Sequence, residues 1–176
     1  LYNYKDLRQE LEIQGFNFRS KSDTEVVLNS IIYWGVEAFK KFNGMFSIAI
    51  WNRVNKNLIL ARDRYGVKPL YYIKQGNFFA FASEQKAILT LPKVRRELNR
   101  SALFEYFTFQ NILTNQTLIK DIKILEPAKF LSLNLKDQDN YNIQLQTKDQ
   151  NNNFFTKNLS LYVRDDKLEI QGTENN

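Results

Sequence analysis

The chain has 176 residues, a formal net charge of +6, and no cysteine or histidine. This length suffices for one domain with a substantial core. Without cysteine or histidine the chain has no disulfide framework and no Cys nucleophile, and Ser-His chemistry lacks its imidazole base. A metal site would have to consist of carboxylates alone, and no acidic cluster has suitable spacing, so we expect no metal site.

The positive charge does not indicate a nucleic-acid partner. Lysine and arginine are scattered, and the one cluster, residues 93–100, contains an acidic Glu97. We therefore expect no nucleic-acid binding. No apolar run is long enough to span a bilayer and no leader sequence is visible, which predicts no membrane association and a cytoplasmic location.

Three helices are expected in the first 44 residues. Asn3 is placed to cap the first helix, and Gly15 to end it. Ser22 and Glu25 have the spacing of a capping box that opens the second helix. Residues 35–42 are expected to form the third.

From Met45 onward the pattern changes to that of strands. Residues 45–51 are almost wholly apolar, which predicts a strand buried on both faces. A short helix is expected over residues 84–89, and another that begins after the cap Asn99. Further strands are expected over residues 58–62, 70–74, 78–83, 119–125 and 130–135. The order indicates an α+β fold, with helices layered on mostly antiparallel sheets.

Composition changes again at Lys136. Half of residues 136–153 are Asn or Gln, which favours a linker. Residues 159–164 and 167–171 then alternate in polarity and predict a weak hairpin. We therefore expect one domain over residues 1–135 and a polar tail over residues 136–176.

The connection over residues 61–72 is unusually charged for a turn between two apolar runs. It contains Arg62, Asp63, Arg64 and Lys68. Two interpretations remain open. The loop shapes a pocket or faces another domain, or it is a hairpin end in which Arg and Asp pair with each other.

Four motifs in order carry a family resemblance. They are residues 22–26 (Ser-Asp-Thr-Glu-Val), 43–51 (Asn-Gly-Met-Phe-Ser-Ile-Ala-Ile-Trp), 61–72 and 81–87. Together they resemble the glutaminase domain of glutamine-hydrolysing asparagine synthetases, a class II (N-terminal nucleophile) amidotransferase. The resemblance runs from residue 1 to about residue 135 and implies an αββα sandwich.

The resemblance also implies that this chain contains no catalytic residue. Such domains hydrolyse glutamine with an N-terminal Cys, whose own amino group is the base, and an Asn and a Gly hold the oxyanion. Residues 1–3 match the end of the family's Asn-Gly-Glu-Ile-Tyr-Asn motif, so the resemblance places the Asn and Gly just before Leu1 and the Cys further upstream. We therefore expect the domain to be incomplete at both ends and the chain to be inactive alone. Whether it counts as an enzyme stays open. ATP and Mg²⁺ would belong to a synthetase domain, the expected partner, which is missing here.

Asp23 is the one residue to which the resemblance assigns a pocket role. In the family, the Asp of this motif contacts the amino group of glutamine. The residues alone leave a second interpretation open, in which Asp23 merely caps the second helix.

The function that these observations predict is that of a partial glutaminase domain. The parent reaction would be the ATP-dependent conversion of aspartate to asparagine, with ammonia from glutamine. Two alternatives stay open: a related amidotransferase of cell-surface sugar or antibiotic assembly, and a non-enzymatic remnant or binding module.

Overall fold

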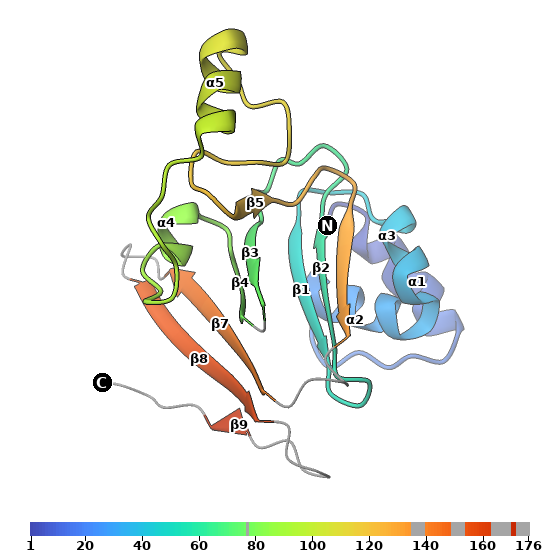
Figure 1. The fold of residues 1–176 in the computed structure, drawn as a ribbon. Coiled ribbons are helices and arrows are strands. Elements are labelled where there is room, and N and C mark those ends of the chain that lie inside the picture. Colours follow the sequence, from blue (N-terminus) through green and yellow to red (C-terminus); the bar gives the residue numbers. More distant parts are fainter. Residues whose placement is uncertain (77, 135–139, 149–153, 163–169, 172–176) are drawn as a thin grey trace.

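The computed structural model describes residues 1–76, 78–134, 140–148, 154–162 and 170–171, and it has an α+β fold (Figure 1). The helices are α1 (Tyr4–Ile13), α2 (Asp23–Trp34), the 3₁₀ turn η1 (Gly35–Glu37), α3 (Ala38–Lys41), α4 (Gln85–Ile88) and α5 (Arg100–Phe109). Among the described residues, no helix combines the length and the apolar character needed to cross a membrane.

The strands form two sheets. The first has the order β1-β2-β6, from β1 (Ser47–Asn52), β2 (Asn57–Arg62) and β6 (Phe130–Asn134). The second has the order β5-β3-β4-β7-β8-β9, from β5 (Ile122–Ile124), β3 (Tyr71–Gln75), β4 (Phe78–Ala82), β7 (Asn140–Lys148), β8 (Phe154–Tyr162) and β9 (Ile170–Gln171). The described pairings are antiparallel except that of β4 with β7, which is parallel.

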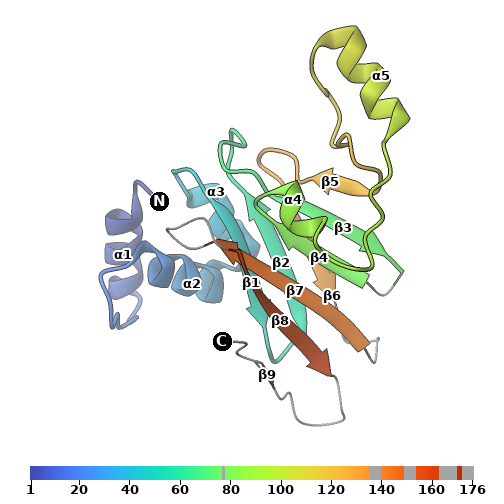
Figure 2. The same cartoon turned by 90° about the vertical axis from the view of Figure 1, so that its left-hand side faces the viewer.

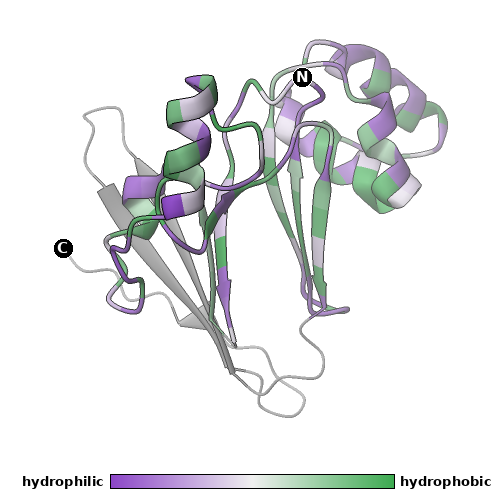
Figure 3. Cartoon of the chain, turned by 45° about the horizontal axis from the view of Figure 1, so that its top comes forward, coloured by the Kyte–Doolittle hydropathy of each residue, from purple (hydrophilic) through white to green (hydrophobic). Residues whose placement is uncertain are grey.

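The two sheets face each other between helices. In β4, Phe79 and Phe81 belong to a core between the sheets, with Leu58 and Leu60 of β2. The intervening β4 residues and Ile73 of β3 face outward and pack against the region of α4. On the other side, α1, α2 and α3 pack against the start of the first sheet through a third core. Figures 1 and 2 show these layers, and the green strands of Figure 3 show their apolar content. The predicted αββα arrangement is thus confirmed.

Three local expectations differ from the structure. The strand expected to be buried on both faces, β1, is only partly buried, because among the described strands it pairs with β2 alone. Asn3 precedes α1 but makes no side-chain cap. Ser22 caps α2 as expected, whereas the Glu25 carboxylate accepts hydrogen bonds from the N–H groups of Arg19 and Ser20, so the capping box is not closed.

Strands β7, β8 and β9 lie in the segment for which we predicted a tail. Strand β8 pairs with β9 through Ser160 with Gln171 and Leu161 with Ile170. The strand β7 falls in the Asn- and Gln-rich part expected to be a linker. The predicted boundary at residue 135 lies outside the described residues and stays a prediction.

Candidate functional site

A cavity of about 460 Å³ lies between the start of α2 and β1. Seven consecutive residues, 45–51, line one wall, and the opposite wall carries Asp23. The remaining lining residues are Leu1, Thr24, Val27 and Leu28. The cavity is thus an apolar slot with one carboxylate at the start of a helix. A site of this composition suits a small ligand that has a cationic group.

The Asp23 carboxylate lies beside Leu1. Its Oδ2 is 2.6 Å from the Leu1 nitrogen. The side chain remains 46% exposed, so a solute can reach it. The position at the N-terminus of α2 further favours its negative charge.

Asp23 does not serve as the side-chain cap of α2. The Oγ of Ser22 accepts the hydrogen bond from the N–H of Thr24, at 3.0 Å, and Asp23 is the first residue of the helix itself. The side-chain cap of α2 and the carboxylate that lines the cavity are therefore two adjacent residues. This separation allows the two interpretations of Asp23 to be tested independently.

Residues 1–3 are held in place by the turn before β1. The N–H of Tyr2 donates to the carbonyl of Asn43 at 2.8 Å. Asn3 donates to the carbonyl of Lys41 and accepts from the N–H of Asn43. Gly44 has φ +156°, and a Cβ there would lie 2.9 Å from the Cα of Leu1. A glycine is therefore required for this close approach.

The charged loop places Asp63 entirely inside the protein. Its carboxylate accepts hydrogen bonds from the backbone N–H groups of Tyr65, Val67, Lys68 and Phe46, at 2.9 to 3.3 Å. Burial acts to raise the pKa of Asp63, but these donors outweigh it and hold the pKa below its ordinary value. The charge is thus stabilised by backbone dipoles.

Arg62, which carries the opposite charge, also holds the loop through backbone groups. Its guanidinium donates to the carbonyls of Lys68, Leu125 and Gly66, at 2.9, 2.6 and 2.5 Å. Gly66 has φ +64°, and a Cβ there would lie 2.8 Å from the Cγ of Pro127. In this part of the chain Arg62 and Asp63 therefore bind backbone groups, and the structure does not support the interpretation of a loop held by an Arg-Asp pair.

The four charged loop residues do not share one site. Arg62 and Arg64 line a smaller cavity of about 270 Å³ beside α3 and the start of β6. Arg64 is exposed and donates to the carbonyl of Lys40 at 3.4 Å. Lys68 is exposed, and Asp63 is buried. None of the four lines the cavity of Asp23.

Phe46 joins the loop to the Asp23 cavity. Its N–H donates to Asp63, and the N–H of Asp63 donates to its carbonyl at 2.9 Å. Phe46 is also a lining residue of the cavity. Sequence reasoning missed this link and the part that Val27 and residues 45–51 take in lining the cavity. The apolar character of residues 45–51 was visible, but nothing in the sequence shows that this strand lies beside α2.

The wall also includes Trp51. Its indole Nε1 is buried and has no hydrogen-bond partner among the described residues. A buried donor without an acceptor is costly, so a ligand or a further segment that supplied one would be favoured here. Trp51 also packs against the core between the sheets.

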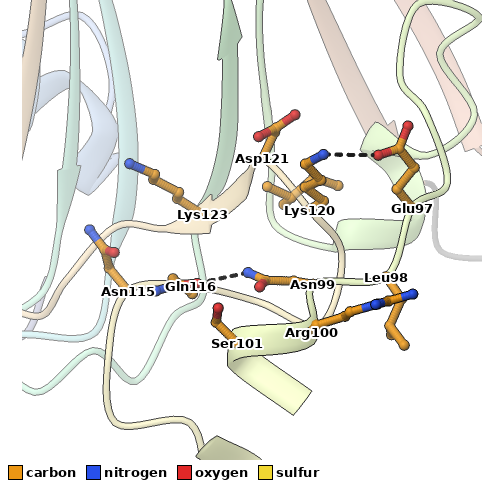
Figure 4. A pocket seen from close by; sticks show the side chains of 11 residues that line it. Glu97, Leu98, Asn99, Arg100, Ser101, Asn115, Gln116, Lys120, Asp121 and Lys123 are labelled. Atoms are coloured by element: carbon orange, nitrogen blue, oxygen red, sulfur yellow. Dashed lines mark hydrogen bonds and ion pairs between the residues drawn. The ribbon is translucent and has the colours of Figure 1, made fainter. Parts of the chain in front are cut away.

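A larger cavity, of about 840 Å³, lies at the base of α5 and is shown in Figure 4. Its polar groups largely bind one another: Lys120 contacts Glu97 at 3.1 Å, and Asn99 donates to Gln116 at 2.8 Å. No predicted site residue lines it. Across the described residues, no group of three or more His, Cys, Asp or Glu side chains is arranged to hold a metal ion.

Comparison with known proteins shows the family to which this chain belongs. Residues 1–144 match the family model of the glutamine amidotransferase domain. The chain therefore belongs to the glutamine amidotransferase domain family.

The relatives are asparagine synthetases. The chain is 43% identical to asparagine synthetase [glutamine-hydrolyzing] 3 of Bacillus subtilis over 133 residues, which cover 75% of this chain and 22% of the relative. It is 40% identical over 128 residues to asparagine synthetase [glutamine-hydrolyzing] 1 of the same organism, with 73% and 20% covered. A putative asparagine synthetase [glutamine-hydrolyzing] of Mycobacterium tuberculosis is 35% identical over 134 residues, with 74% and 21% covered. The chain thus spans about a fifth of the length of these relatives.

Proposed function

We propose that this chain forms the glutamine-holding part of the amidotransferase domain of a glutamine-hydrolysing asparagine synthetase. The observation that carries the proposal is the Asp23 carboxylate, whose side chain is 46% exposed on the wall of a 460 Å³ cavity with a mostly apolar lining. Such a carboxylate can pair with the ammonium group of glutamine. The identity to the Bacillus and Mycobacterium relatives favours this role over an amidotransferase of sugar or antibiotic assembly.

In this role, the chain's own residues bind and orient the substrate. Asp23 would pair with the glutamine ammonium, and the apolar lining residues Val27 and 45–51 would exclude water from the side-chain amide. The Arg62 and Asp63 hydrogen bonds would keep the Phe46 end of this wall fixed. Because the chain has no cysteine, the nucleophile would come from a segment outside it.

The parent protein would use the ammonia to convert aspartate to asparagine with ATP. ATP and Mg²⁺ would be held by the synthetase domain, the partner in this proposal. The charged exposed residues Arg64 and Lys68 would then face that domain or the solvent, and the buried pair Arg62 and Asp63 would shape the loop.

The test uses a joined protein. The segment of Bacillus subtilis asparagine synthetase 3 from its nucleophilic Cys to the residue that precedes its matched region is fused to Leu1. In this protein, Asp23→Asn removes the charge that binds the ammonium and keeps the side-chain size. Loss of one charge-assisted contact, worth about 1.5–3 kcal/mol, should raise the KM for glutamine roughly 10- to 150-fold.

Ser22→Ala is the matched control. It removes the helix cap, which should lower stability by about 1 kcal/mol and leave the KM for glutamine nearly unchanged. Steady-state ammonia release and thermal unfolding are measured for both variants. An Asp23→Asn protein with a lower Tm and an unchanged KM would show that Asp23 serves the helix and not the substrate.

A further inference from the structure

Helix α5 carries large aromatic side chains that the described part of the protein leaves uncovered. Phe104 and Phe107 are each 74% exposed, and Phe109 is 58% exposed. Within the helix, Ala102 alone is buried. Phe104 and Phe107 stand three residues apart and so lie on the same side of the helix; we call this pair the α5 aromatic face. Figures 1 and 2 show α5 projecting from the body of the molecule.

The base of α5 is nevertheless firmly anchored. Asn99 accepts a hydrogen bond from the N–H of Ala102 and donates to Gln116 at 2.8 Å (Figure 4). One Glu105 oxygen accepts from the N–H of Leu113 at 2.8 Å, and the other accepts from a neighbouring threonine hydroxyl. A ten-residue helix without packing is marginal in water. These contacts therefore hold the helix at one position while its aromatic face stays bare.

A fixed, exposed aromatic pair marks an interaction surface. Aromatic side chains supply much of the binding energy of protein interfaces, and apolar patches of this kind on a surface usually have a partner. We propose that the α5 aromatic face is the docking surface for the part of the protein that continues the asparagine synthetase relatives beyond the matched region. The inference rests on the proposed function, which supplies this partner. The relatives are about five times longer than the matched segment.

The charge around α5 favours this partner over a second copy of the chain. Residues 93–123 contain six Lys or Arg and three Asp or Glu. A second copy packed on the same face would bring two basic surroundings together, which costs free energy. The surface of a different protein segment, unlike that of a second copy, can offer an apolar pocket surrounded by acidic side chains. The partner face is therefore expected to be apolar at its centre and rich in carboxylates around it.

The experiment measures binding of the full 176-residue chain to the C-terminal segment of Bacillus subtilis asparagine synthetase 3, the part that follows its matched region, by titration calorimetry. Phe107→Glu should weaken binding at least about tenfold, as for a residue at the centre of an interface. The matched control is Ile13→Glu on α1, where Ile13 is 75% exposed; it should change the dissociation constant by less than about twofold. Circular dichroism checks that both variants keep the helical content of the parent chain.

Several outcomes would overturn the proposal: no binding of the segment, equal weakening by both variants, or a Phe107→Glu protein that binds as the parent does. A chain that dimerises by itself, and becomes monomeric with Phe107→Glu, would assign the surface to a second copy instead. The assay needs neither glutamine nor its hydrolysis. A failure of docking is therefore distinguishable from a failure of the proposed glutamine site, which the KM of Asp23→Asn reports.

Discussion

At the scale of single residues, Asp63 is the group on which the loop most depends. It is fully buried and accepts four backbone hydrogen bonds. Asp63→Asn replaces one acceptor oxygen with an NH₂ group that faces N–H donors and removes the charge from the others. We expect the free energy of unfolding to fall by about 2–3 kcal/mol, measured by chemical denaturation.

Asp121→Asn is the matched control for that change. Asp121 is exposed and has φ +67°, a conformation that Asn tolerates. Its carboxylate accepts a hydrogen bond from Gln75, and the amide oxygen of Asn would retain it. The expected change is under about 0.5 kcal/mol. Equal effects of the two substitutions would mean that the buried backbone contacts of Asp63 contribute little.

Asp63 also makes the stability of the folded protein depend on pH. The pKa of Asp63 in the folded protein lies below its ordinary value of 3.8. Its stabilising contribution is therefore fully present above that value and is lost as the pH falls through the folded pKa. Between about pH 6 and about pH 3, the parent chain should lose more stability than Asp63→Asn does. Parallel stability curves for the two proteins would contradict this assignment.

The residues of the loop also show where sequence reasoning reached its limit. The charges at Arg62 and Asp63 marked the loop as unusual and left two interpretations open. They did not show that Arg62 reaches Leu125, 63 positions along the chain, or that Asp63 reaches Phe46. Such partners depend on the packing of distant strands. The resemblance singled out Asp23, but the residues alone could not separate it from the cap, which is Ser22.

At the scale of elements, periodicity predicted most of the helices and strands. The capped helices α2 and α5 and the strands β2, β3 and β4 lie close to their expected ranges. Strands β3 and β4 pair antiparallel, and Gly76, with φ +55°, lies between them. The burial of β1 was overestimated, since an apolar strand is buried on both faces only when neighbours cover it. The sequence of a strand does not reveal which neighbours are present.

The uncovered edge of β1 should govern the behaviour of the isolated chain. Among the described strands β1 pairs with β2 alone, and its residues line the Asp23 cavity. An uncovered edge of this kind promotes pairing with other chains. We expect the purified chain to bind a hydrophobic-surface dye and to aggregate on refolding. Ala49→Lys, which places a charge on β1 at an exposed position, should reduce the aggregation severalfold, measured by light scattering.

The control for the β1 substitution is Asn55→Lys. It adds the same charge at an exposed position in the turn between β1 and β2. Aggregation should then stay close to that of the parent chain. A parent chain that unfolds in one sharp transition as a monomer, without dye binding, would refute the role of the β1 edge.

At the scale of the whole molecule, the layers explain why the site lies where it does. The core between the sheets fixes β2 against β4, the loop after β2 fixes Phe46, and Phe46 belongs to the wall opposite Asp23. The aromatic content that runs through the sequence serves this packing, as the contacts of Phe79 with Tyr72 and Phe81 show. The cavity of Asp23 is thus assembled from segments that are distant in sequence, and its full composition could not be predicted from the motifs alone.

The central claim is that this fold holds glutamine for hydrolysis. Its most direct test is ammonia release from glutamine by the protein in which the upstream segment of the Bacillus subtilis relative, from its nucleophilic Cys onward, is joined to Leu1. We predict hydrolysis at a rate close to that of the relative, and none above the blank for the 176-residue chain, which has no cysteine. A joined protein that folds, as shown by circular dichroism, yet releases no ammonia above the blank would contradict the account.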